Sequence, residues 1–256
     1  MNILFLGTGT STGVPTVCCP CPVCKSDDPM NKRLRASILV EHQGFNILVD
    51  TSTDLRQQCL AHNITGIDAV LYTHHHADHM NGIDELRCFN FSNKTRIPIY
   101  ANAATLTQLR QNFRYIFNGS SPEGGGIPQV DPVGVDGAAL ELGGVRIRPV
   151  DVLHGGLTIT GYRFNDAAYI TDCKSLPENS KAALRGLDLL ILNALGFEPH
   201  PTHFCLREAL AAIAELKPKR ALLTHINHQF DHARVGAQLP DNVELAYDGL
   251  RVEMGG

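Results

Sequence analysis

Long apolar runs, an excess of basic charge and a dispersed cysteine pattern are all missing from this 256-residue sequence. No apolar run approaches the ~18 residues of a membrane span, and Ile3–Leu6 is too short for a secretory signal peptide. Lysine and arginine number 22 against 26 aspartate and glutamate, a net charge of −4, which argues against a broad nucleic-acid surface. These absences predict a cytoplasmic protein that uses neither a membrane nor a large nucleic acid. They leave open a small anionic substrate.

The eight cysteines are not spread as the disulfide pairs of a small secreted domain would be. Four of them crowd into seven residues, as Cys18-Cys19-Pro20-Cys21-Pro22-Val23-Cys24. The spacing Cys19-x-Cys21-x-x-Cys24 lets three thiolates hold one face of a tetrahedral zinc ion, with a fourth ligand from elsewhere in the chain. Cys18 is an alternative to Cys19. The alternative to a metal site is a set of small buried apolar side chains.

A histidine-rich stretch follows a short apolar segment and reads Leu71-Tyr72-Thr73-His74-His75-His76-Ala77-Asp78-His79. Successive side chains of an extended segment point to opposite sides, so His74 and His76 share one side. Asp78 and His79 follow as the chain turns. Imidazole and carboxylate are ligands of zinc, manganese and iron, and these four are enough to begin two adjacent sites. The alternative is a surface loop that binds metal only by accident.

Other polar residues stand at the ends of predicted apolar strands. They are Asp50 after a hairpin strand, His154 after 140–152, Asp172 after 168–171, and His225 after the segment that begins at Arg220. Such residues are what a metal site assembled at one sheet edge requires. Asp50 either hydrogen-bonds the free nitrogens of the histidines or caps the helix that follows it.

Strands, helices and hairpins alternate along the chain, which indicates an α/β fold. We expect helices at 54–60, 80–90, 105–117 and 206–216, the last with Thr202 as a capping candidate, and a closing hairpin of 243–247 with 250–253. The glycine-rich stretch Gly7–Pro15 resembles a phosphate-binding loop, but no helix pattern follows it, so its glycines are expected to permit close backbone approach. Segment 118–132 is either a lid or a connector. It does not divide the chain, because metal-ligand candidates lie on both sides of it.

The motif His-x-His-x-Asp-His after an apolar strand resembles the signature of the metallo-β-lactamase superfamily. The resemblance implies a single-domain αβ/βα four-layer sandwich over residues 1–256, and it identifies a scaffold rather than a substrate. It also implies one divalent ion held by His74, His76 and His154, and a second held by Asp78, His79 and His225. Asp172 and a water or hydroxide would bridge the two ions, with Asp50 behind the histidines.

Motifs along the whole chain further resemble the PhnP family, which comprises phosphodiesterases of bacterial phosphonate breakdown. These motifs are Gly7-Thr8-Gly9, Gly13-Val14-Pro15, Cys19-x-Cys21-x-x-Cys24 and Thr224-His225-Ile226-x-His228-Gln229-Phe230-Asp231. The resemblance implies a structural zinc held by the three cysteines and His228, and a general acid at His203. Lys174 departs from the family pattern and either contacts a phosphate or lies in solvent. The remaining histidines match no ligand position and receive no role: His42, His62, His75, His200 and His232.

The resemblance implies hydrolysis of small cyclic or ribose-containing phosphodiesters by a hydroxide held between two ions of manganese, zinc, iron or nickel. It implies that Asp78 and His203 are essential to catalysis and that the protein is a homodimer. One alternative is hydrolysis of a lactone, β-lactam or thioester at the same two-ion site. Two others are a transfer-RNA 3′-processing nuclease, which the missing basic patch disfavours, and a metal or cofactor carrier. The complete set of seven candidate ligands favours an enzyme over a carrier.

Overall fold

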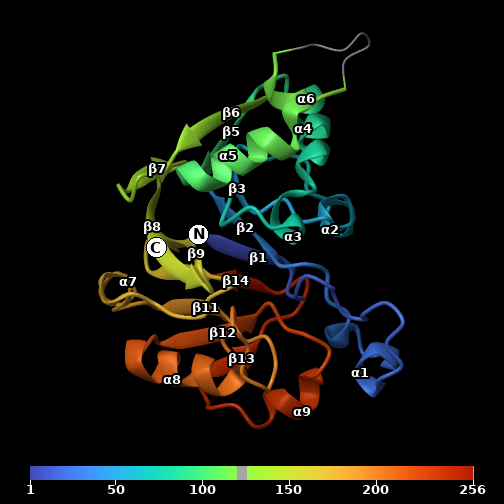
Figure 1. The fold of residues 1–256 in the computed structure, drawn as a ribbon, viewed down its shortest axis with the longest axis vertical. Coiled ribbons are helices and arrows are strands. Elements are labelled where there is room, and N and C mark those ends of the chain that lie inside the picture. The colour runs from blue at the N-terminus through green and yellow to red at the C-terminus, as the bar shows by residue number, and fades with distance from the viewer. Residues whose placement is uncertain (120–125, 256) are drawn as a thin grey trace.

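Within residues 1–119 and 126–255, which the computed structural model describes, fourteen strands form two seven-stranded sheets (Figure 1). The first sheet has the order β14-β1-β2-β3-β4-β5-β6. Its strands are β1 (Asn2–Gly7), β2 (Ser37–His42), β3 (Phe45–Val49), β4 (Ala69–Leu71), β5 (Ile97–Ala101), β6 (Val130–Gly134) and β14 (Arg251–Glu253). The second has the order β13-β12-β11-β10-β9-β8-β7. Its strands are β7 (Leu140–Leu142), β8 (Val145–His154), β9 (Leu157–Phe164), β10 (Ala167–Ile170), β11 (Leu189–Asn193), β12 (Arg220–Thr224) and β13 (Val243–Leu245).

Helices cover the outer face of each sheet (Figure 1). The first sheet carries α2 (Leu55–Ala61), α3 (Ala77–Met80), α4 (Leu86–Asn93), α5 (Ala103–Asn112) and α6 (Arg114–Phe117). The second carries α7 (Glu178–Ala183), α8 (Leu206–Leu216) and α9 (His232–Gly236). Short turns at α1 (Pro22–Lys25), η1 (Pro29–Asn31) and η2 (Ile83–Glu85) complete the set. The predicted αβ/βα four-layer sandwich is confirmed.

The strands of the central layers are apolar on both faces because both faces are covered. In β1, Ile3 and Phe5 belong to the core between the two sheets, whereas Leu4 and Leu6 belong to the core under the helices. Full burial of one such side chain contributes about 1.5–3 kcal/mol. The continuous apolar run Ile3–Leu6, too short for a signal peptide, is therefore a strand whose side chains contribute to both cores.

Strand directions bring the site residues to one edge. Strands β3 to β6 are parallel to one another, as are β10 to β13. Strand β8 is antiparallel to β9, which is antiparallel to β10, so β8 and β10 run the same way. The carboxyl ends of β3, β4, β8, β10 and β12 all carry candidate ligands or their partners.

The helix predicted over 80–90 is broken into α3, η2 and α4. Gly82 explains the break. A Cβ at this position would lie 2.0 Å from the carbonyl oxygen of Ser52, and the Gly82 amide donates to the Thr51 carbonyl at 2.9 Å. The close backbone approach fixes the turn that follows the metal motif.

The predicted closing hairpin is wrong. Strand β13 pairs in parallel with β12, whereas β14 pairs with β1 in the other sheet. The turn between them is held by Asp248, which accepts from Thr8 Oγ1 at 2.7 Å and from the Leu34 amide at 2.6 Å. These long-range contacts override the local turn signal, and the chain crosses from one sheet to the other.

Of the predicted segment 118–132, residues 120–125 lie outside the described part, and 130–132 belong to β6. Among residues 1–119 and 126–255, no helix combines the length and apolar character needed to span a membrane.

Candidate metal centre

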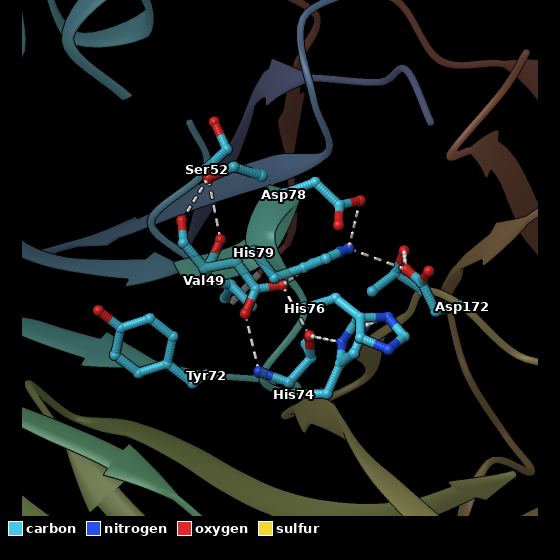
Figure 2. Close-up of polar contacts among 12 residues, drawn as sticks. Val49, Ser52, Tyr72, His74, His76, Asp78, His79 and Asp172 are labelled. Atoms are coloured by element: carbon cyan, nitrogen blue, oxygen red, sulfur yellow. Dashed lines mark hydrogen bonds and ion pairs between the residues drawn. The ribbon is translucent and has the colours of Figure 1, made fainter. Parts of the chain in front are cut away.

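Seven candidate ligands converge from strand ends of both sheets. Figure 2 shows His74, His76, Asp78, His79 and Asp172 pointing toward a common point. The histidine motif follows β4 and enters α3, so Asp78 and His79 lie in the first helical turn after His76. His154 is the last residue of β8, Asp172 follows β10, and His225 follows β12. Six of the seven are buried, and His76 is partly exposed.

The ligand atoms fall into groups whose members lie within 4.8 Å of one another. One group is His74, His76 and His154, and another is Asp78, His79 and His225. Asp172 belongs to two further groups, one with His74 and His79 and one with His154 and His203. Its carboxylate lies 3.2 Å from His79 Nε2 and 3.2 Å from His225 Nε2. The structure thus brings together the two sets that the resemblance implied, with Asp172 between them.

Asp50 lies directly behind the centre. Its Oδ2 is 2.7 Å from His79 Nδ1, so the ring presents Nε2 to the ligand cluster. The same carboxylate accepts from the Thr73 amide at 2.7 Å and from Thr73 Oγ1 at 2.8 Å. Burial raises the pKa of Asp50 against the opposing effects of His79 and Thr73. The predicted alternative, a cap on α2, is not seen, because Asp54 is the residue that precedes that helix.

Three buried carboxylates surround His79. Burial opposes a charge on this ring, but Asp78, Asp172 and Asp50 raise its pKa well above the usual value. Against the opposing effect of burial, His225 and His79 hold the pKa of Asp172 well below its usual range. The cluster therefore carries negative charge that demands a cation, since buried carboxylates are stable only when paired or metal-bound.

The unpaired atoms fit a metal centre. Among the described residues, His79 Nε2 and both ring nitrogens of His225 are buried without a hydrogen-bond partner. A buried polar atom without a partner costs about 1–3 kcal/mol, and a ligated ion would satisfy His79 Nε2 and one of the two ring nitrogens of His225. The donor set of imidazole and carboxylate suits borderline divalent ions. The residues present therefore fit two divalent ions.

Three residues of the centre have left-handed backbones although none is glycine. The φ angles are +65° at Asp50, +55° at Asp172 and +53° at His225. Such conformations cost roughly 1–3 kcal/mol each and persist where the surroundings hold them. Ser37 Oγ donates to the Asp50 carbonyl at 2.9 Å. The buried Asn193 amide holds the peptide after Asp172, accepting from Cys173 N at 2.6 Å and donating to its carbonyl at 3.1 Å.

The N-terminal loop fixes the segment after His225. The Ile226 amide donates to the Thr8 carbonyl at 2.9 Å, and the Thr10 amide donates to the Ile226 carbonyl at 3.0 Å. A Cβ at Gly9 would lie 2.8 Å from the Arg33 carbonyl oxygen. The glycines permit close backbone packing beside the centre, as the sequence suggested, and the pattern is not that of a phosphate loop.

His203 stands at the rim of the centre, with its Nε2 2.9 Å from Asp172 Oδ1. Burial lowers its pKa, and Asp172 partly offsets this.

The predicted cap at Thr202 is wrong. Cys205 is the N-cap of α8, and its amide donates to Glu208 Oε2 at 3.0 Å. Thr202 instead accepts from His154 Nδ1 through its carbonyl oxygen at 2.8 Å.

Lys174 does not point into the centre. Its Nζ pairs with Glu208 at 2.8 Å and 3.0 Å, so the ammonium ties the loop after Asp172 to the first turn of α8. Lys174 is therefore in neither of the two predicted positions: it does not face a substrate phosphate at the centre, and it is not free in solvent.

The cysteine loop forms a second cluster. Cys19, Cys21, Cys24 and His228 offer ligand atoms within 4.8 Å of one another. Cys19 Sγ lies 3.0 Å from His228 Nδ1, whereas Cys18 is exposed and outside the group. A hydrogen bond from the Cys24 amide lowers the pKa of Cys21 to about 6, a value that favours the thiolate that binds metal. The donor set is that of a tetrahedral zinc site.

Comparison with known proteins agrees with this geometry. A family model described as a β-lactamase superfamily domain matches residues 45–226. Because that match covers most of the chain, the chain belongs to the metallo-β-lactamase superfamily. Within the superfamily, the chain is similar to a solved diphosphatase of the PhnP family, with 43% identity and a TM-score of 0.93 over 99% of this chain and 98% of that one.

Two curated relatives carry other names. The octanoyltransferase of Porphyromonas gingivalis is 34% identical over 256 residues, which is 98% of this chain and 51% of that protein. The chain thus spans about half the length of that relative. Coenzyme PQQ synthesis protein B of Rhodopseudomonas palustris is 27% identical over 89% of this chain and 90% of its own length.

Proposed function

We propose that the chain is a two-metal hydrolase of small phosphodiesters. The observation that carries the proposal is the position of Asp172. Its carboxylate lies between two three-residue ligand groups and 2.9 Å from His203 Nε2. A potential proton donor therefore stands beside the place where a substrate phosphorus would sit. The cysteine cluster with His228 would hold a third ion, a structural zinc.

The chemistry requires little from other side chains. When bound, two divalent ions would polarise an attacking water and neutralise the phosphoryl oxygens. Hydrolysis forms a bond from the water oxygen to phosphorus and breaks the bond to the leaving oxygen. His203 Nε2 would give its proton to that leaving oxygen, a contribution of about 10²–10⁴-fold. Asp50 would hold the tautomer of His79 throughout.

A second candidate reaction is hydrolysis of a diphosphate. It is favoured by the name of the 43% identical PhnP-family relative, a diphosphatase. Attack on phosphorus is common to both reactions, and only the leaving group differs. The similarity to a cofactor-synthesis protein would suggest a carrier role. That role is disfavoured because each of the seven ligand positions has a candidate His or Asp residue.

The test is a substrate panel with fixed metal supply. Purified protein is loaded with manganese and assayed on bis-p-nitrophenyl phosphate, a cyclic ribose phosphodiester, a nucleoside diphosphate ester, a lactone and a β-lactam. Asp78→Ala should abolish diesterase activity. Asp131→Ala, which removes an exposed carboxylate paired with Arg96, should leave that activity intact.

His203→Ala should lower turnover of the cyclic substrate while the metal content stays at the wild-type value. A loss of metal in that variant would make His203 a ligand rather than an acid. Lactone or β-lactam cleavage without phosphodiester or diphosphate cleavage would keep the fold and reject the proposed substrates.

A further inference from the structure

The loop that carries His203 contains a cluster of three side-chain groups, and one of them, His200, has no role assigned from the sequence. His203 Nδ1 lies 2.9 Å from Thr202 Oγ1 and 3.1 Å from His200 Nδ1. Thr202 Oγ1 lies 3.1 Å from His200 Nδ1. The three groups form a triangle on the side of the His203 ring that faces away from Asp172.

Counting protons in this triangle leads to one assignment. A neutral imidazole has one N–H, and an acid that faces the centre must carry it on Nε2. His203 Nδ1 is then an acceptor, which the Thr202 hydroxyl satisfies as donor. The Thr202 amide donates to His200 Nδ1 at 3.4 Å, so His200 accepts there, anchors the Thr202 backbone and leaves the hydroxyl proton to His203 Nδ1.

Thr202 is fixed in place by contacts on its other sides. Its carbonyl oxygen accepts from His154 Nδ1 at 2.8 Å. Its methyl group lies over Gly155, where an added Cβ would meet Thr202 Cγ2 at 2.8 Å. Because Cys205 takes the capping role in α8, the Thr202 hydroxyl is free to face the two imidazoles. One residue thus orients both a candidate metal ligand and the candidate acid.

We propose that Thr202 and His200 are positioning residues that hold His203 in the tautomer with the proton on Nε2. The proposal rests on the phosphodiesterase function proposed above, in which His203 protonates the leaving oxygen. It predicts a dependence on the leaving group. An alkoxide leaving group needs the proton of a correctly oriented acid, whereas p-nitrophenolate leaves readily without it.

The test compares Thr202→Val with Thr202→Ser and His200→Ala in the metal-loaded protein. Valine keeps the shape, the methyl contact and the carbonyl, and removes only the hydroxyl. Thr202→Val and His200→Ala should each lower kcat on the cyclic ribose phosphodiester by at least about tenfold, which is part of the roughly 10²–10⁴-fold that a general acid contributes. On bis-p-nitrophenyl phosphate they should change kcat by less than about twofold. Serine should restore most of the lost turnover, with KM and metal content unchanged throughout.

A second readout is independent of turnover. In the zinc-loaded protein, the ¹⁵N shifts of the His203 ring should report Nε2–H in the wild type and in Thr202→Ser. Nδ1–H should gain population in Thr202→Val. Equal losses on both substrates, loss of metal, or an Nδ1–H tautomer in the wild type would overturn the proposal. If the wild type cleaves neither phosphodiester, the proposed function fails, and the ring shifts still decide the tautomer.

Discussion

Asp50 shows how much a single residue outside the ligand set can control. It holds His79 Nδ1 at 2.7 Å and two groups of Thr73, the residue before His74. It therefore orients the end of β4, which presents His74, and it orients the His79 ring within the ligand cluster. The sequence placed Asp50 at the end of an apolar strand and predicted either a bond to a histidine nitrogen or a helix cap, but it did not identify His79 and Thr73 as the partners.

Asp50→Asn should weaken metal binding by about 10–100-fold, because the partners of ligating histidines typically contribute that much. Competition between the protein and a metal chelator measures the affinity. Asp131→Asn, an exposed carboxylate paired with Arg96, is the control. An affinity equal to that of the wild type would mean that Asp50 acts only on the backbone.

Asp248, which lies away from the metal centre, makes the folding stability of the protein depend on pH. Burial raises its pKa to about 6 from 3.8, although the Leu34 amide and Thr8 partly oppose this. A raised carboxyl pKa means that the folded state binds the proton more tightly, so ionisation costs stability above about pH 6. That cost disappears as the pH falls from about 6 toward 4.

The wild type should therefore gain free energy of unfolding relative to Asp248→Asn as the pH is lowered from 7 to 4.5. The gain is at most about 3 kcal/mol, from 1.36 kcal/mol per pKa unit. Urea denaturation of both proteins at each pH measures it. A difference between the two proteins that stays constant with pH would show that Asp248 titrates normally.

At the scale of elements, the cysteine loop supports the catalytic edge. His228 follows His225 by three residues, and Cys19 Sγ lies 3.0 Å from its Nδ1. Metal in this cluster would connect the loop 18–24 to the strand end that presents His225. The Thr8 carbonyl holds the neighbouring Ile226 amide from the other side.

Cys21→Ser should reduce bound metal by one ion per chain and lower the melting temperature by several degrees, since metal affinity contributes to folding. Because Thr8 still holds the segment, kcat/KM in excess manganese should fall only by about tenfold. Elemental analysis, thermal denaturation and the diesterase assay measure the three effects. Cys88→Ser, at an exposed cysteine on α4, is the control. An unchanged metal count would contradict the proposed zinc site.

Elements also show where sequence patterns stop being informative. Strand ends were predictable because apolar runs ended in His154, Asp172 and His225, and parallel strands bring such ends to one edge. The break after Met80 was not predictable, because it depends on how closely Gly82 approaches Ser52. The roles of Asn193 and Thr202 depend likewise on partners that only folding brings near.

At the scale of the whole molecule, the four layers and the grouping of ligands followed from the motif and its resemblance. The sheets that β13 and β14 join could not be predicted in this way. Nothing local to β13 or β14 indicates that they join different sheets, and Thr8 and Leu34, more than two hundred residues away, hold the turn between them. Non-local contacts of this kind leave no periodicity in the sequence.

The central claim is that the His/Asp cluster would hold two divalent ions and that the protein would then hydrolyse phosphodiesters. The most direct measurement is metal content per chain together with bis-p-nitrophenyl phosphate hydrolysis, followed as manganese is returned to stripped protein. We predict about three ions per chain, with activity rising as the last two bind and no activity in Asp78→Ala. One ion per chain and no ester hydrolysis at any metal level would contradict the account.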